Sequence, residues 1–243
     1  MGAITLLAAC GGGGEGATAG SASTPNAGPH NLVGLFRLTD GKCSTSQTEP
    51  PTGSYFAMLS GKSLAGPFVA NGTAADASGA KCPNQSSTPL LAGSDGGLKT
   101  GNYQPNPTSA FDSSGNGLAG LIAKPASFFG TDFALSTNAT DPQSTTSVAT
   151  PKIMDTGGKL SGDLSALNVA WNTGYYNQGA PKPDGTYPGV TTALSGTIAC
   201  DGGFTMIWAS TIVGGAFNNF TGSWHFTGTF VPASGSLSQA LGC

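Results

Sequence analysis

Charged residues are scarce in this sequence, and their scarcity argues against several classes of function. Only 9% of the 243 residues are charged, and the formal net charge is −3. The nine Lys and Arg residues are scattered along the chain and form no basic patch. Because nucleic-acid binding depends on clustered positive charge, we expect no nucleic-acid partner.

Histidine and glutamate are also rare, which limits the catalytic sites that the chain could build. The sequence has two His, and its Glu residues are Glu15 and Glu49. Glycoside hydrolysis generally needs two carboxylates, so a hydrolase of this sequence would have to use Asp. Most Asp residues, however, stand in turns, where local hydrogen bonding explains them. His225 is accompanied by no G-x-S-x-G nucleophile motif and is expected to be a solvent-facing position on a strand.

These shortages favour a protein without catalytic activity. We assign no catalytic residue and expect a surface binding or structural domain. The alternative is a secreted hydrolase, directed at carbohydrates or esters, that uses Asp residues.

Long helical periodicity is missing too, whereas turn-forming residues are abundant. Gly (39) and Pro (16) make up nearly a quarter of the chain. Residues Phe220–Val231 alternate apolar and polar without a break, which is typical of a strand with one buried face. Phe204–Val213 is expected to pair with it. The pattern predicts an all-β fold, a single antiparallel β-sandwich or small β-barrel of about eight strands with long loops.

Elsewhere the strand signals are shorter. Asn31–Leu38 and Ser127–Thr137 are each predicted to form one strand, with Phe129, Phe133 and Leu135 on one face of the second. Asn172–Gly189 is predicted to be a long loop, and the chain is expected to end in a short helix.

The N-terminus carries a localisation signal. Leu7-Ala8-Ala9-Cys10 follows a short apolar run and resembles the signal of bacterial lipoproteins, in which the Cys is acylated. No Lys or Arg precedes this run, so we expect the natural start to lie upstream of Met1. The resemblance implies a signal-peptide remnant at residues 1–9. A lipidated Cys10 with a disordered Gly/Ser/Ala-rich tether would follow at 10–29, and an all-β domain at 30–243.

This reading predicts a palmitate-bearing protein anchored by lipid in the cell envelope, at the outer membrane or cell surface. Several acyl chains would anchor it stably. The alternative is that the apolar run forms a buried N-terminal strand.

Four cysteines remain once Cys10 is set aside, an even number that fits an oxidising compartment. Three pairings are possible. We favour Cys43–Cys82 and Cys200–Cys243, because each pair stays within its own half of the chain and the second fixes the C-terminus. A metal site is the weaker alternative, since no two Cys have the spacing of a C-x₂-C ligand pair.

The last third of the chain carries a second resemblance. The segments W-N-x-G-Y-Y-N-Q-G (171–179), P-K-P-D-G-x-Y-P-G (181–189) and I-V-G-G-A-F-N-N-F-T-G-S-W-H-F-T-G-T-F (212–230) resemble uncharacterised exported β-rich bacterial proteins. Some of these proteins end in sorting tails of the PEP-CTERM type, which this sequence lacks. The resemblance implies export and a β-rich fold, and it brings no catalytic or binding residues.

The segment around the tyrosines is the most plausible binding surface. It contains Tyr175, Tyr176, Asn177, Gln178 and Tyr187. Tyrosine rings offer flat apolar faces, and amide side chains donate and accept hydrogen bonds. This combination suits a glycan or a protein surface, although the same residues also fill ordinary β-loops.

A second candidate is a calcium loop. Asp112, Ser114 and Asn116, followed by a glycine, have the alternating spacing of calcium ligands. Position 12 of such a loop would be Ala123 in place of the usual bidentate Glu. We therefore expect no cofactor, with calcium as a weak alternative at this turn.

Overall fold

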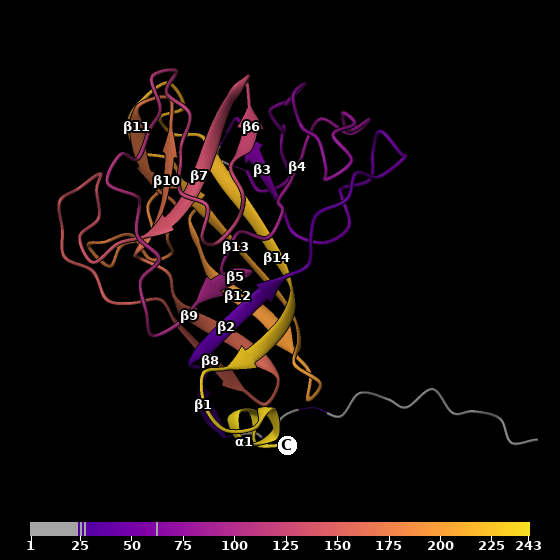
Figure 1. The fold of residues 1–243 in the computed structure, drawn as a ribbon, viewed down its shortest axis with the longest axis vertical. Coiled ribbons are helices and arrows are strands. Elements are labelled where there is room, and N and C mark those ends of the chain that lie inside the picture. The colour runs from indigo at the N-terminus through magenta and orange to yellow at the C-terminus, as the bar shows by residue number, and fades with distance from the viewer. Residues whose placement is uncertain (1–23, 25, 27, 62) are drawn as a thin grey trace, which may run out of the picture.

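The structure is a computed structural model that describes residues 24, 26, 28–61 and 63–243 (Figure 1). The signal sequence at 1–9, Cys10 and most of the tether lie outside the described residues. Within them the chain is almost entirely β-structure, as the sequence predicted. The elements are β1 Pro29–Asn31, β2 Gly34–Leu38, β3 Tyr55–Leu59, β4 Thr88–Pro89, β5 Gly97–Lys99, β6 Ala126–Phe128, β7 Thr131–Thr137, β8 Lys152–Thr156, β9 Lys159–Asp163, β10 Leu167–Trp171, β11 Gly174–Asn177, β12 Thr192–Ile198, β13 Gly203–Thr211, β14 Thr221–Pro232 and α1 Leu237–Leu241.

The strands form two antiparallel sheets. The large sheet follows the order β1-β8-β9-β12-β13-β14-β2-β5, and β3 joins it by pairing with both β14 and β4. The small sheet has the order β11-β10-β7-β6. Side chains of both sheets meet in one hydrophobic cluster, so the two sheets share a core.

The large sheet is strongly curled. β1 stands at one end of the eight-strand path and β2 next to the other end, yet only Leu32 and Val33 separate them. The three Cα steps from β1 to β2 span at most about 11 Å. The path must therefore bend until its ends approach each other, which gives a half-barrel covered by the small sheet.

The predicted strand at Phe220–Val231 is confirmed as β14, the longest strand of the structure. Nine residue pairs join it to β13, from Thr211↔Thr221 to Gly203↔Thr229. Its other edge pairs first with β3 and then with β2. Trp224, Phe226 and Phe230 of the predicted apolar face are at most 1% exposed. β14 thus lies in the middle of the core along its whole length.

Three local predictions were wrong. The strand predicted at Asn31–Leu38 is broken at Leu32, where the chain passes from β1 to β2, because the curl of the sheet brings two edges together there. The strand predicted at Ser127–Thr137 is the hairpin β6–β7, whose two-residue turn is Phe129-Gly130. The loop predicted at Asn172–Gly189 contains β11, which pairs with β10 in register from Trp171↔Gly174 to Asn168↔Asn177.

Both predicted disulfides are confirmed. Cys43 is bonded to Cys82 and Cys200 to Cys243. The second bond holds the end of α1 beside the β12–β13 turn. The helix itself, predicted near the C-terminus, is capped by Ser236, whose side chain accepts a hydrogen bond from the backbone N–H of Gln239.

No helix in the described part of the chain has the length and apolar character required to cross a membrane.

Gly228 provides a test of the β14 pairing. A Cβ added there would lie 1.8 Å from the carbonyl oxygen of Arg37 in β2, so backbone would have to move. We expect Gly228→Ala to lower the free energy of unfolding by about 2–3 kcal/mol, measured by urea denaturation. Gly61→Ala is the matched control, because nothing lies within 4 Å of its Cβ position. Equal stability of the two variants would contradict this packing.

Candidate functional site

A polar pocket lies where three loops meet at one edge of the small sheet, and we call it the Asp141–Lys182 pocket. Its volume is about 530 Å³. The loops follow β7, β11 and β13. The lining residues are Asp141, Gln143, Ser144, Thr146, Asn177, Lys182, Pro183, Asp184, Thr186, Pro188 and Val213.

Asp141 is the buried acid of this pocket, with 0% of its surface exposed. One carboxylate oxygen accepts hydrogen bonds from the backbone N–H and the hydroxyl of Ser144, both at 2.7 Å. The other oxygen accepts from the side-chain amides of Asn168 and Asn177, both at 2.9 Å. Asp141 therefore fastens its loop to β10 and β11, since a buried carboxylate needs such partners.

Asn177 connects the acid to the rest of the network. Its amide nitrogen also donates to the carbonyl of Ser165 at 2.7 Å. Its side-chain oxygen accepts from the N–H of Gly179 at 2.9 Å. Its own backbone N–H donates to the side-chain oxygen of Gln143 at 2.7 Å. Every hydrogen-bonding group of its side chain is thus occupied within the protein.

Lys182 is the buried base of the pocket and is only 6% exposed. Its Nζ donates to the carbonyl of Asn177 at 2.6 Å and to the hydroxyl of Ser210 at 2.7 Å. Burial lowers the pKa of Lys182 to about 8, against the attraction of Asp141 and Asp184. Neither acid forms an ion pair with it; within the described residues the ion pair is Lys99–Asp95. The ammonium is therefore held by neutral oxygens.

Some hydrogen-bonding capacity in the pocket faces the open space. An ammonium has three donors, and the protein takes two of those on Lys182. Asp184 uses one carboxylate oxygen to accept from Thr186, which leaves the other oxygen as an acceptor. The pocket thus presents a donor and an acceptor, with the apolar rings of Pro183 and Pro188 between them.

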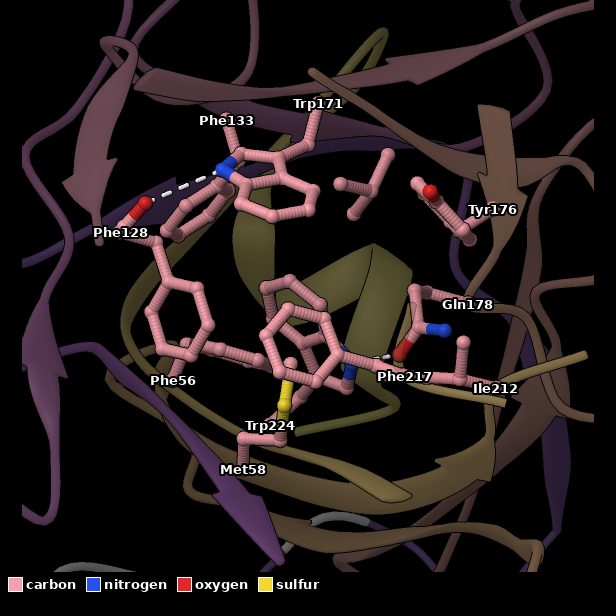
Figure 2. Close-up of a pocket in the computed structure, with 11 residues that line it drawn as sticks. Phe56, Met58, Phe128, Phe133, Trp171, Tyr176, Gln178, Ile212, Phe217 and Trp224 are labelled. Carbon is pink, nitrogen blue, oxygen red and sulfur yellow. Dashed lines mark hydrogen bonds between the residues drawn. The ribbon is translucent and has the colours of Figure 1, made fainter. Parts of the chain in front are cut away.

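A second, apolar cavity lies between the two sheets, and we call it the aromatic cavity (Figure 2). Its free volume is about 40 Å³. Rings from both sheets surround it, and Phe217, from the loop after β13, lies across it in front of Trp224 in Figure 2. The lining residues are Phe56, Met58, Phe128, Phe133, Val169, Trp171, Tyr176, Gln178, Ile212, Phe217 and Trp224.

Gln178 is the one amide among these walls, and its polar atoms are occupied. Its side-chain oxygen accepts from the indole N–H of Trp224 at 3.2 Å, and its side-chain nitrogen donates to the carbonyl of Asn177 at 3.1 Å. Its backbone carbonyl accepts from the indole N–H of Trp208 at 2.9 Å. Gly222 makes room for it, because a Cβ there would lie 2.1 Å from the Gln178 side-chain oxygen.

The residues predicted to bind a ligand are divided among several places. Tyr176 and Gln178 line the aromatic cavity, and Asn177 lines the Asp141–Lys182 pocket. Tyr175 packs on Phe111, with ring centroids 5.1 Å apart. Tyr187 is 46% exposed. The structure therefore brings three of the five predicted residues to the walls of cavities, but it does not gather all five into one surface.

The predicted calcium turn is closed by its own hydrogen bonds. The carboxylate of Asp112 accepts from the backbone N–H groups of Ser114 and Asn116 and from the side-chain amide of Asn116. These bonds, with the Asn116 side chain first, lower the pKa of Asp112. The side-chain oxygen of Asn116 accepts from the N–H of Asp132 at 2.8 Å. A cation at this turn would compete with all of these donors. In the described residues, no three His, Cys, Asp or Glu side chains gather as a metal site.

His225 is more enclosed than a solvent-facing residue. Its ring stacks on Tyr55 with centroids 4.6 Å apart, and its Nδ1 lies 3.1 Å from the carbonyl oxygen of Gly53. Burial lowers the pKa of His225. These contacts explain the residue as part of the packing of β14 against β3.

Comparison of the chain with protein-family models, with curated proteins and with solved structures finds no match.

Lys182 and Asp141 were missed by the reading of the sequence. Lys182 lies in Pro181-Lys182-Pro183-Asp184-Gly185, which has the composition of an exposed turn. The cue that could have identified it is the unbroken apolar and aromatic surroundings on both sides. Burial of a lysine depends on the loops that fold over it, however, and the local sequence does not reveal those.

Lys182 predicts a specific pH dependence of stability. Its pKa is about 8 in the folded state, below its unfolded value, so the unfolded chain binds more protons between these values. Relative to Lys182→Met, the wild-type protein should gain about 2 kcal/mol of stability as the pH rises from about 7 to about 9.5. Urea denaturation across this range measures the difference. The exposed Lys159→Met serves as the control, with no such gain; parallel curves for all three proteins would contradict a buried ammonium.

Proposed function

We propose that this chain is a cell-envelope lipoprotein whose β-domain binds a hydroxyl-rich ligand, such as a glycan, in the Asp141–Lys182 pocket without transforming it. The observation that carries this proposal is the combination of a buried acid and a buried base at the wall of an open polar pocket. Buried charges are costly to maintain, so a site that keeps two of them beside open space is a reasonable place for binding.

The free groups of the pocket match the chemistry of a polyol. A sugar hydroxyl both donates and accepts hydrogen bonds. The unused donor of Lys182 and the unused oxygen of Asp184 could satisfy one hydroxyl each way, and the proline rings could contact the carbon face of the sugar. A ligand oxygen bound to Lys182 would also favour its charged form. The bound ligand would therefore relieve part of the cost of burying this ammonium.

The proposed location is supported by two features. Leu7-Ala8-Ala9-Cys10 has the pattern of an acylation signal. The two disulfides favour an exported protein, because structural disulfides persist mainly in oxidising compartments. The resemblance of the last third of the chain to exported β-rich bacterial proteins points the same way.

The alternative, a hydrolase that uses Asp residues, would draw on the acids of this pocket. Asp141 is a poor candidate for general acid or base, because both of its oxygens are already bonded to four donors of the protein. General acid–base catalysis needs a carboxyl group within reach of the substrate. Binding without turnover is therefore the better-supported reading.

A panel of saccharides can test the binding proposal. We expect the full chain to melt at higher temperature with at least one of them, since a ligand at 100 times its Kd stabilises by about 2.7 kcal/mol. Lys182→Met should lose this shift, because it removes the donor that faces the pocket. Lys159→Met should keep it. The saccharide should be recovered intact; release of cleavage products would favour the hydrolase instead.

If no saccharide shifts the melting temperature, or if Lys182→Met responds like the wild type, the pocket is not the site of glycan binding.

The lipid anchor has a separate test. When the protein is expressed from its natural start, the N-terminal peptide of the mature chain should begin at Cys10 and carry acyl chains, as mass spectrometry can show. Cys10→Ser should abolish acylation and release the protein from the membrane fraction. The nearby Thr18→Ala should leave both unchanged. A mature protein with an unmodified Cys10 would overturn the anchor.

A further inference from the structure

The walls of the aromatic cavity leave no hydrogen-bonding group for a ligand to use. The amide of Gln178 is occupied by Trp224 and Asn177. The indole N–H of Trp171 donates to the carbonyls of Phe128 and Thr131, both at 3.1 Å. A buried water needs two to four polar partners, so the cavity is dry and can accept only an apolar group.

The size of the cavity points to a single ring. Its free volume of about 40 Å³ is too small for a benzene molecule. Phe217 fills the adjoining space on the side of the loop, and moving this side chain out would add the volume of one phenyl ring. A cavity of about 150 Å³ with apolar walls binds benzene. The cavity with Phe217 displaced therefore suits one aromatic ring.

Phe217 lies on a loop that is bonded mainly to itself. The backbone N–H of Asn219 donates to the carbonyl of Ile212 at 2.8 Å, and that of Phe220 donates to the carbonyl of Phe217 at 2.9 Å. Gly214 and Gly215 precede Phe217 with φ values of 76° and 67°. The loop can thus turn at these glycines without breaking the pairing of β13 with β14, which ends at Thr211↔Thr221.

The contacts that hold Phe217 inward are aromatic. Its ring centroid lies 5.4 Å from that of Trp171 and 5.8 Å from that of Phe128. On its outer side it stacks on Phe129 at 5.9 Å, with 26° between the ring planes. A bound ring could replace these contacts with contacts of the same kind, so the exchange is favourable in type.

Phe129 marks the mouth of the cavity. It occupies the first position of the β6–β7 turn with φ 54°, a conformation that a phenylalanine rarely adopts and that Asn adopts more readily. Its side chain is nevertheless 52% exposed. Unfavourable backbone conformations persist most often at functional sites. Holding an exposed ring in this turn contributes little to the core, but it provides a stacking surface at the entrance.

We propose that the aromatic cavity binds a small neutral molecule with one aromatic ring, which enters by displacing Phe217 and passes the ring of Phe129. The neutral character follows from the dry, uncharged walls. The single ring follows from the volume, and the aromatic type follows from the rings that surround the space. This site is independent of the Asp141–Lys182 pocket, although Asn177 and Gln178 are neighbours in the chain.

Benzene and cyclohexane, similar in size, are the probes for this proposal. We expect benzene to raise the melting temperature of the full chain in a saturable manner and to change its tryptophan fluorescence, because Trp171 and Trp224 line the cavity. Cyclohexane should bind more weakly, since it offers no ring face for aromatic contact. Phe217→Ala should bind benzene about tenfold more tightly, because no side chain has to be displaced. If that variant does not fold, Phe217→Leu tests the same point with a smaller change.

Phe129→Asn is the matched variant at the mouth. It should retain the fold, because Asn-Gly is the preferred pair for such a turn, and it should bind benzene more weakly than the wild type. Binding by Phe217→Ala but not by the wild type would show that Phe217 is a fixed part of the core and would overturn the proposal. Absence of saturable binding in both proteins would overturn it as well. Equal binding by wild type and Phe129→Asn would remove Phe129 from the site.

Discussion

The structure depends on the pairing of β14 along both of its edges. One edge is joined to β13 over nine residue pairs, and the other is shared by β3 and β2. A strand paired on both sides, with its aromatic face buried, fixes the register of all its neighbours, because a shift by one residue would expose that face. Trp224 then belongs to the part of the core beneath the small sheet, and Phe230 to the part enclosed by the curl.

One short segment links this central strand to both cavities. Tyr176 and Gln178 face the aromatic cavity, whereas Asn177 between them faces the polar pocket. This alternation is the ordinary consequence of strand geometry, which sends successive side chains to opposite sides. Gln178 also binds the indole groups of Trp208 and Trp224. The two candidate sites are therefore built on opposite sides of one segment that is anchored to the centre of the large sheet.

The sequence was informative where one periodic signal dominated. The alternation of β14 predicted its span and its buried face, and the positions of four cysteines within two halves of the chain predicted both disulfides. It misled where two signals competed. At Phe129-Gly130 the row of aromatic residues outweighed the single glycine that marks the turn. The polar pocket depends on loops that are distant in sequence, and no local pattern records that Asp141 and Asn177 meet.

The placement of the chain ends bears on how the proposed sites would be used. β1 and α1 lie together at one end of the molecule, and the β6–β7 and β10–β11 hairpins lie towards the opposite end (Figure 1). An anchor at Cys10 would be followed by a flexible stretch up to Pro29, whose root-mean-square length is about 24 Å. That length lets the domain stand clear of the bilayer with β1 and α1 facing the membrane. The mouth at Phe129 would then face away from the membrane, where a dissolved ligand could reach it without passing between protein and lipid.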